Sequence, residues 1–423
     1  MKKKFIATIL VGTLVVGALS GCGNSTQETV VTTAQIEETT TATNDTEAED
    51  TAKAEEEATR EEEANSYYEV GRACLYGLDG QEFDLEAAYT NFEKALELGR
   101  TDANFYLGVL YYGEYGYPET DYTKAKTYFE AVEDNPYAQI LLGELYYFGE
   151  GVVEDKIKGQ ELIDTVIEKG YMEAYMVSGY IAEDEEDYDS AFEYYSKALE
   201  SEEQLFISMA TNNIGYAYKY GLGVEQDYDK ALEWYEKAAD LGNPTAMDNI
   251  GYMYANGQGV EQDYAKALEW YEKAADLKHA TSMSRIAYLY EDGLSVEQDY
   301  AKALEWYEKA IDLGDTWAMK EIAYMYQNGW GVEQDYAKAL EWYEKAADLG
   351  DADAMNTIGY QYAMGEIVEQ DYAKAIEWYE KAADLGNPHA MGNIGYMYEN
   401  GLGVEQDSAK AQEWYDKATA AEE

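Results

Sequence analysis

Apolar and polar residues recur with a helical period over most of this chain. In residues 263–277 the apolar side chains cover about half of a helical wheel, and charged side chains cover the other half. A second helical pattern occupies residues 245–254, and the segment between them, 255–262, contains glycines. The pattern predicts two short amphipathic helices joined by a turn.

The same pair of helices recurs with a fixed spacing. Six tryptophans are each separated by 36 residues: Trp234, Trp270, Trp306, Trp342, Trp378 and Trp414. The period is shared by a tyrosine column, Tyr216, Tyr252, Tyr288, Tyr324, Tyr360 and Tyr396, and by small residues at Gly215, Gly251, Ala287, Ala323, Gly359 and Gly395. Earlier small residues, Gly71, Gly108, Gly143 and Gly179, extend the count to ten repeats. We therefore expect about ten helix-turn-helix units, of which the first four are divergent.

Local signals fix the helix ends. Asp263 is suited to cap the second helix of its repeat, because its carboxylate accepts hydrogen bonds from free backbone N–H groups of the first turn. Glycines such as Gly242 and Gly314 follow the second helices and favour the left-handed conformation that ends a helix. A helix that is apolar over half its circumference needs more than one partner, so neighbouring repeats are expected to stack.

The repeated unit "AMxxIGYMYxNGxGVEQDYAKALEWYEKAADLG" resembles the Sel1-like repeat, a relative of the tetratricopeptide repeat. The resemblance covers nearly all of residues 67–421, with divergent repeats in 66–214 and regular repeats in 215–423. It implies an all-α protein, an α/α right-handed superhelical solenoid whose concave surface is lined by the first helices. It also implies a role in assembling protein complexes.

The N-terminus carries an export signal. Lys2, Lys3 and Lys4 precede an apolar run, 5–19, which is shorter than the roughly 20 residues of a membrane span. The sequence Leu-Ser-Gly-Cys that ends at Cys22 resembles a bacterial lipobox. That resemblance implies a lipoprotein signal peptide in residues 1–21 and a lipid anchor on Cys22. The alternative is an ordinary secretory signal.

Residues 22–65 are predicted to link this anchor to the repeats. The segment after Cys22 is rich in Thr, Glu, Ala and Asp and has no aromatic residue, so it cannot build a core of its own. Its last part, 52–65, is rich in Glu and Ala and is expected to continue as helix into the first repeat.

The chain is strongly acidic. It has 30 basic and 86 acidic residues, a net charge of −56, which excludes nucleic acid as a partner and repels anionic lipid headgroups. We expect contact with a membrane only through the lipid anchor, and protein or peptide partners with basic patches.

No set of residues indicates catalysis, a metal or a cofactor. The Gly-x-Gly segments lack a preceding strand and a third glycine, so they are interpreted as turns. His279 and His389 lie in different repeats, and no Ser-His-Asp arrangement has support in the sequence. Cys74 is interpreted as a buried small residue. The acidic run 183–187 is interpreted as a solvated loop, because its spacing is not that of a calcium loop.

The repeats differ from one another mainly in their first helices. The second helices are nearly identical, whereas positions expected to be exposed on the first helices vary: Asp248, Asn249, Ser284, Arg285, Lys320, Glu321, Asn356, Thr357, Gly392 and Asn393. Two tryptophans outside the regular column, Trp317 and Trp330, are candidate interface anchors. All of these except Gly392 and Asn393 form the predicted partner-binding set, although neutral drift would also explain the variation.

These observations predict a non-catalytic scaffold that faces outward from a bacterial cell membrane and binds proteins through the first helices. The alternative is a lipoprotein that binds the cell wall or a polysaccharide by stacking aromatic rings on sugars. The methionine column Met247, Met283, Met319, Met355 and Met391 is assigned to core packing rather than to binding.

Overall fold

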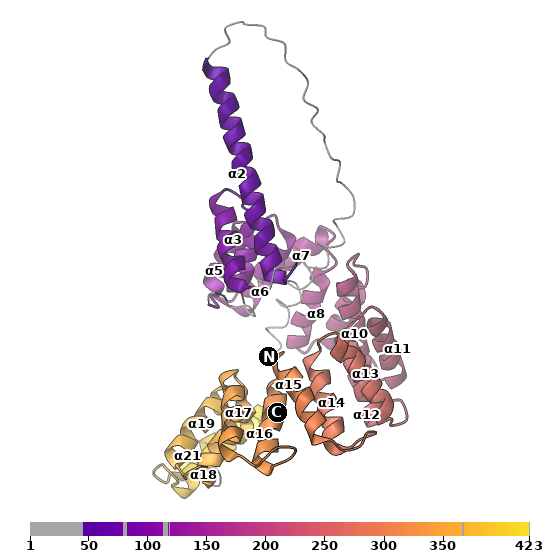
Figure 1. Ribbon diagram of the computed structural model, residues 1–423, viewed down its shortest axis with the longest axis vertical. Helices are drawn as coiled ribbons and strands as arrows, with labels where there is room; N and C mark the ends of the chain where they lie inside the picture. The colour runs from indigo at the N-terminus through magenta and orange to yellow at the C-terminus, as the bar shows by residue number, and fades with distance from the viewer. Residues whose placement is uncertain (1–44, 79–82, 113–116, 118, 366–367, 423) are drawn as a thin grey trace. The chain divides into compact units, whose positions relative to one another are not determined.

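The computed structural model describes residues 45–78, 83–112, 117, 119–365 and 368–422 (Figure 1). Every regular element in this part is an α-helix, and the 20 helices follow one another in sequence as ten pairs. The predicted signal peptide and Cys22 lie outside the described residues. None of the described helices combines the length and the apolar character that a membrane span requires.

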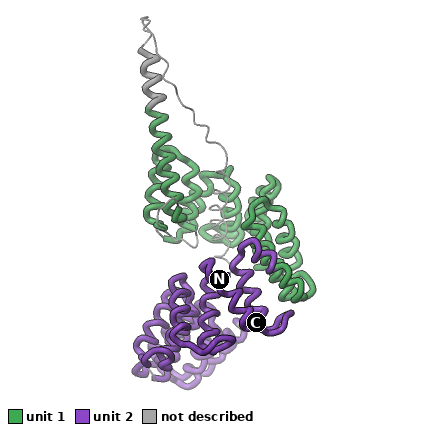
Figure 2. The backbone as a smooth tube through the Cα atoms, turned by 45° about the vertical axis from the view of Figure 1, so that its right-hand side comes forward, with its two compact units in different colours: residues 1–234 green, residues 235–423 purple. Residues whose placement is uncertain are grey.

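The chain forms two compact units, residues 1–234 and 235–423 (Figure 2). Unit 1 contains α2 (Asp45–Tyr76), α3 (Leu85–Glu97), α4 (Ala103–Tyr111), α5 (Tyr122–Glu130), α6 (Pro136–Phe148), α7 (Lys156–Glu168), α8 (Ala174–Asp184), α9 (Tyr188–Ala198) and α10 (Gln204–Tyr220). The boundary falls inside α11 (Tyr228–Asp240). Unit 2 contains α12 (Pro244–Asn256), α13 (Tyr264–Asp276), α14 (Ala280–Asp292), α15 (Tyr300–Ile311), α16 (Thr316–Asn328), α17 (Tyr336–Asp348), α18 (Ala352–Met364), α19 (Tyr372–Asp384), α20 (Pro388–Asn400) and α21 (Ser408–Glu422).

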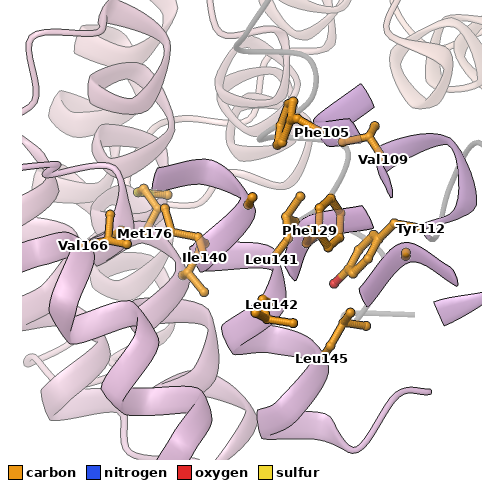
Figure 3. Packing of buried hydrophobic residues seen from close by; sticks show 14 of the residues in the cluster. Phe105, Val109, Tyr112, Phe129, Ile140, Leu141, Leu142, Leu145, Val166 and Met176 are labelled. Atoms are coloured by element: carbon orange, nitrogen blue, oxygen red, sulfur yellow. The ribbon is translucent and has the colours of Figure 1, made fainter. Parts of the chain in front are cut away.

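Within each unit, neighbouring helices along the chain pack against one another. The first helix of a repeat packs on its second helix, and the second helix packs on the first helix of the next repeat. The expected stacking is therefore confirmed. In unit 1 the core runs continuously from repeat to repeat, and Figure 3 shows Phe129 of α5 beside Leu141 of α6, with Val166 of α7 and Met176 of α8 close to Ile140.

The helix ends are those that the sequence predicts. Asp263 Oδ1 accepts hydrogen bonds from the backbone N–H groups of Ala265 and Lys266, each at 3.0 Å. Gly242 follows α11 with a φ of 85°. The turn between α12 and α13 places Gly257 and Gly259 at φ values of 65° and 70°, so the Gly-x-Gly segment serves as a turn.

The small residues recur because an aromatic ring of the second helix packs directly against the backbone at this position. A Cβ atom added to Gly251 would stand 2.5 Å from Cε1 of Tyr271, and one added to Gly108 would stand 2.5 Å from Phe129. The helices of these repeats can therefore approach so closely only because the position is glycine, whereas the repeats with Ala287 and Ala323 leave room for one methyl group.

The buried side of the second helices is narrower than predicted. Tyr271 is buried, but Trp270 is half-buried and Leu277 is 49% exposed. Lys273 Nζ lies 3.6 Å from the centroid of the Trp270 ring, so the lysine shields the tryptophan from water. Four of the five members of the methionine column are confirmed as core: Met283 and Met319 are buried, and Met355 and Met391 pack against buried clusters.

The first helix begins well before the first repeat. α2 starts at Asp45, so the predicted boundary between residues 65 and 66 falls inside a continuous helix, and the expected helix over 52–65 is present. Ala64 is buried, and Arg60 donates hydrogen bonds to the backbone carbonyls of Glu97 and Leu98 at 3.1 Å. Cys74 of α2 is also buried, as predicted, and burial raises the pKa of its thiol.

Candidate protein-binding face

The first helices of unit 2 share one side that carries the predicted partner-binding residues. With 100° per residue, the positions equivalent to 245, 248, 249, 252 and 256 of α12 lie on the same side of each helix. We call this side of α12, α14, α16, α18 and α20 the first-helix face. It includes every predicted partner-binding residue except Trp330, which lies in the turn after α16.

The expectation that the varied residues are exposed was wrong. Asp248 is 6% exposed and Ser284 is fully buried. The other members of the predicted set are half-buried: Asn249, Arg285, Trp317, Lys320, Glu321, Trp330, Asn356 and Thr357. The physical reason is that several of these side chains reach the next repeat along the chain.

Asp248 and Arg285 link two neighbouring repeats. Arg285 Nε lies 3.1 Å from Oδ1 and 3.3 Å from Oδ2 of Asp248. The hydroxyl of Ser282 donates a further hydrogen bond to Asp248 Oδ1 at 2.8 Å. The carboxylate is thus compensated despite its burial.

Further along the face, similar links join later repeats. Lys320 Nζ lies 3.0 Å from Asp351 Oδ2 and 3.6 Å from Asp353 Oδ2. Asn393 Nδ2 donates to Asn356 Oδ1 at 2.9 Å. Part of the variation between repeats therefore reflects side chains that match their neighbours in the stack.

The structure also brings together a histidine, a serine and an aspartate that the sequence did not connect. His279 Nδ1 lies 2.9 Å from Ser282 Oγ, but the Ser282 hydroxyl donates its proton to Asp248. His279 accepts from the backbone N–H of Ser282 and caps α14, and burial lowers its pKa. Because Ser282 is fully buried and faces the carboxylate, this cluster is a helix cap and not a nucleophile–base pair.

Acidic and aromatic side chains gather on α14, α15 and α16. Tyr307 donates to Glu291 Oε2 at 2.7 Å, and Trp317 packs edge-on against the Tyr307 ring at 6.0 Å between centroids. Burial raises the pKa of Glu321 to about 7, and the nearby Glu291 carboxyl adds to the shift. Trp330 stacks on Tyr300 at 5.7 Å and meets Tyr324 edge-on at 5.2 Å.

The exposed aromatic residues of the face are tyrosines, whose fixed spacing in the sequence marks the period of the repeats. Tyr288 and Tyr324 are each 43% exposed, Tyr360 is 44% exposed and Tyr396 is 53% exposed. A helical wheel alone would not have separated them from buried residues, because Asp248 lies on the same side of α12 as position 252 and is 6% exposed.

A shallow pocket of about 560 Å³ opens between α14 and the start of α16. It is lined by Ala280, Thr281, Arg285, Leu313, Gly314, Asp315, Thr316 and Trp317. Two members of the predicted set, Arg285 and Trp317, thus meet at one depression between neighbouring repeats.

Metal binding has no support in the described part of the chain, where no group of three or more His, Cys, Asp or Glu side chains could hold an ion. In the acidic run 183–187, Asp187 caps α9 through the backbone N–H of Ser190, and Glu185 pairs with Lys156 at 2.8 Å. These carboxylates have structural partners.

Stacked helix pairs with a common glycine turn define a helix-pair repeat protein related to tetratricopeptide repeat proteins. More specifically, the chain belongs to the Sel1 repeat family. The sequence model of the Sel1 repeat matches residues 64–99, 101–131, 136–163, 208–243, 244–279, 280–315, 318–351, 352–387 and 388–422. A tetratricopeptide repeat matches residues 173–205, the divergent repeat that lacks the Gly-x-Gly turn.

The solved structure of one Sel1 repeat protein agrees with this assignment. A Sel1 repeat protein from Oxalobacter formigenes is 35% identical, with a TM-score of 0.50 over 58% of this chain and 99% of that chain. The protective antigen c5321 of uropathogenic Escherichia coli, which has the same type of fold, is 28% identical, with a TM-score of 0.41 over 89% of this chain and 87% of that one. No curated protein sequence matches the chain significantly.

Proposed function

We propose that this protein is a membrane-anchored, extracytoplasmic scaffold that binds other proteins through the first-helix face of unit 2. Sel1 repeat solenoids are typical of protein-interaction scaffolds and are generally non-catalytic. The observation that carries the proposal is the column of exposed tyrosines on the first-helix face. Exposed aromatic residues are common anchors of interfaces.

The proposed location rests on the N-terminal sequence. A basic start, a short apolar run and the lipobox-like segment before Cys22 support export and lipidation, which place the repeats on the outer face of a bacterial cell membrane. Replacing Cys22 with serine is expected to move the protein from the membrane fraction to the soluble fraction. A variant that remains with the membrane would contradict lipid anchoring.

Binding through the face is tested by site-specific photocrosslinking on intact cells. A benzophenone amino acid at position 324 is expected to capture a partner protein with a basic surface, whereas the same group at position 336 is not. Tyr336 is a matched control, because it is 41% exposed but begins a second helix. Equal capture at both positions, or none at position 324, would remove the support for this face.

Charge reversal at Arg285 or Lys320 is a poor test of binding. Both side chains hold neighbouring repeats together through ion pairs, so their substitution changes stability as well as surface charge. Substitutions of the exposed tyrosines separate these effects.

A second candidate function is binding to cell-wall sugars or another polysaccharide. The exposed tyrosine rings favour it as well, since aromatic faces stack on sugar rings. The purified protein would then sediment with cell-wall material in the absence of any partner protein, and Tyr324→Ala would reduce the sedimented fraction.

A further inference from the structure

Tyr252, the first tyrosine of the face, already has a positively charged side chain against its ring. The guanidinium carbon Cζ of Arg285 lies 4.9 Å from the centroid of the Tyr252 ring. Arg285 belongs to the following repeat, so it crosses from α14 to the tyrosine of α12. The chain thus contains one example of an arginine stacked on this tyrosine column.

The later repeats lack this arginine. The positions equivalent to Arg285 are Glu321, Thr357 and Asn393, which face the tyrosines equivalent to Tyr252 in the preceding repeats: Tyr288, Tyr324 and Tyr360. None of these three residues can place a positive charge over a ring. The rings of Tyr288, Tyr324 and Tyr360 are correspondingly more than two-fifths exposed.

The charge around these rings favours a cation. Tyr288 forms a hydrogen bond with Asp292, which is the largest cause that raises the pKa of the tyrosine to about 12. Asp292 is exposed, and Glu321 follows in the next repeat. The basic residues of the face, Arg285 and Lys320, are already paired with aspartates. The groups that this face presents to a partner are therefore aromatic rings and negatively charged carboxylates.

We propose that an extended, arginine- or lysine-bearing segment of a partner protein lies along Tyr288, Tyr324 and Tyr360. Each cation stacks on one ring, in the way that Arg285 stacks on Tyr252, and Asp292 and Glu321 supply compensating charge. This inference rests on the proposed function of the face and adds the chemistry of the partner.

The spacing of the repeats sets the spacing of the cations. Packed helices lie roughly 10 Å apart between axes, and a chain extended in the polyproline II conformation advances about 3.1 Å per residue with three residues per turn, so that every third side chain lies on the same side. Basic side chains at every third residue therefore match successive tyrosines. A contiguous basic cluster of the same charge matches them less well.

The test uses the full chain and a fluorescein-labelled nine-residue peptide with arginine at every third position and glycine or serine between. Binding is measured by fluorescence anisotropy. The peptide is expected to bind at low salt and to weaken as NaCl screens the charges, whereas a peptide with glutamine in place of arginine is not expected to bind. Moving the three arginines together should weaken binding.

Two kinds of variant connect the binding to the tyrosines. The double substitution Tyr288→Leu with Tyr324→Leu keeps apolar side chains but removes the rings, and should weaken binding about tenfold, whereas Tyr336→Leu should change it less than about twofold. Thr357→Arg supplies an internal arginine next to Tyr324 in the manner of Arg285. It should also weaken binding, although all the tyrosines are intact.

Binding that is unchanged by the double leucine variant, or that is equal for the arginine and glutamine peptides, would overturn this inference. If position 324 still crosslinks a partner on cells in that case, the proposed function stands and the partner is recognised by other chemistry. If crosslinking at position 324 is also lost, both the inference and the proposed function fail.

Discussion

One equivalent position lies in opposite environments in α4 and α6 of unit 1 and in the later first helices of unit 2. In α4 of unit 1 all nine residues are buried, and Val109, which follows the small residue of its repeat, is 1% exposed. The equivalent residue of α18 in unit 2 is Tyr360, which is 44% exposed. The same helix pair can therefore close this face or leave it open, and in the later repeats the open face presents aromatic rings.

A second position in unit 1 shows what closure requires. Glu144 of α6 is equivalent to Tyr252 but is buried, and Tyr112 donates a hydrogen bond to its Oε2 at 2.8 Å. Burial raises the pKa of Glu144 to about 8. α6 of unit 1 thus buries even a carboxyl group at this position, whereas α18 of unit 2 leaves a large aromatic side chain in solvent.

The largest expected difference in stability between the two units comes from placing a charged side chain at the equivalent positions 109 and 360. Val109→Asp should lower the free energy of unfolding of unit 1 by about 3–5 kcal/mol, because a carboxylate without a partner is costly to bury. Tyr360→Asp should change the stability of unit 2 by less than about 0.5 kcal/mol. Urea denaturation followed by circular dichroism, with hydrogen exchange to assign the affected helices, measures both. Similar costs at the two positions would contradict the comparison.

The links between repeats in unit 2 should give a smaller effect. A double-mutant cycle with Asp248→Ala and Arg285→Ala should yield a coupling free energy of about 1–2 kcal/mol, since the aspartate is buried. The exposed pair of Lys345 and Glu341, 3.4 Å apart, is the control and should yield less than about 0.5 kcal/mol. A coupling free energy no larger than that of the control pair would show that the varied positions do not stabilise the contact between repeats.

The smallest expected effect concerns Glu321 and depends on pH. Its pKa in the folded protein, about 7, lies above the usual value for a glutamate, so the folded state binds the proton more tightly than the unfolded state does. The folded state is therefore favoured at acidic pH, and this advantage is lost as the pH rises towards 7.

Glu321→Gln should consequently raise the Tm at pH 8 by about 2–4 °C, the shift that about 1 kcal/mol produces in a unit of this size. At pH 4 the variant and the original protein should melt at the same temperature. Scanning calorimetry at the two pH values makes the comparison, and a Tm increase of the same size at both would refute the assignment to Glu321 ionisation.

Much of the fold could be predicted from the sequence because its determinants are local. A capping aspartate such as Asp263, a left-handed glycine such as Gly257 and a half-apolar wheel act within one repeat. Their recurrence at a fixed period specifies the stack, since each helix pair must bury its apolar side on a neighbour. The predicted count of ten repeats and the core role of the methionines followed from this reasoning.

The candidate site was only partly predictable because exposure on the first helices depends on neighbouring repeats. Asp248 and Ser284 vary between repeats as surface residues do, but both are buried. The tyrosine column is constant between repeats as core residues are, but it faces solvent. Whether a position is constant among the repeats therefore does not show whether its side chain serves packing or binding.

By itself, the sequence determined the all-helical architecture, the repeat length, the helix ends and the acidic charge, because each depends on residues that are near one another in the chain. The tertiary structure alone decided which positions of the first helices are open, which charges are paired and where an arginine already covers a tyrosine. These features join side chains from successive repeats, and only the packing of one repeat on the next brings them together.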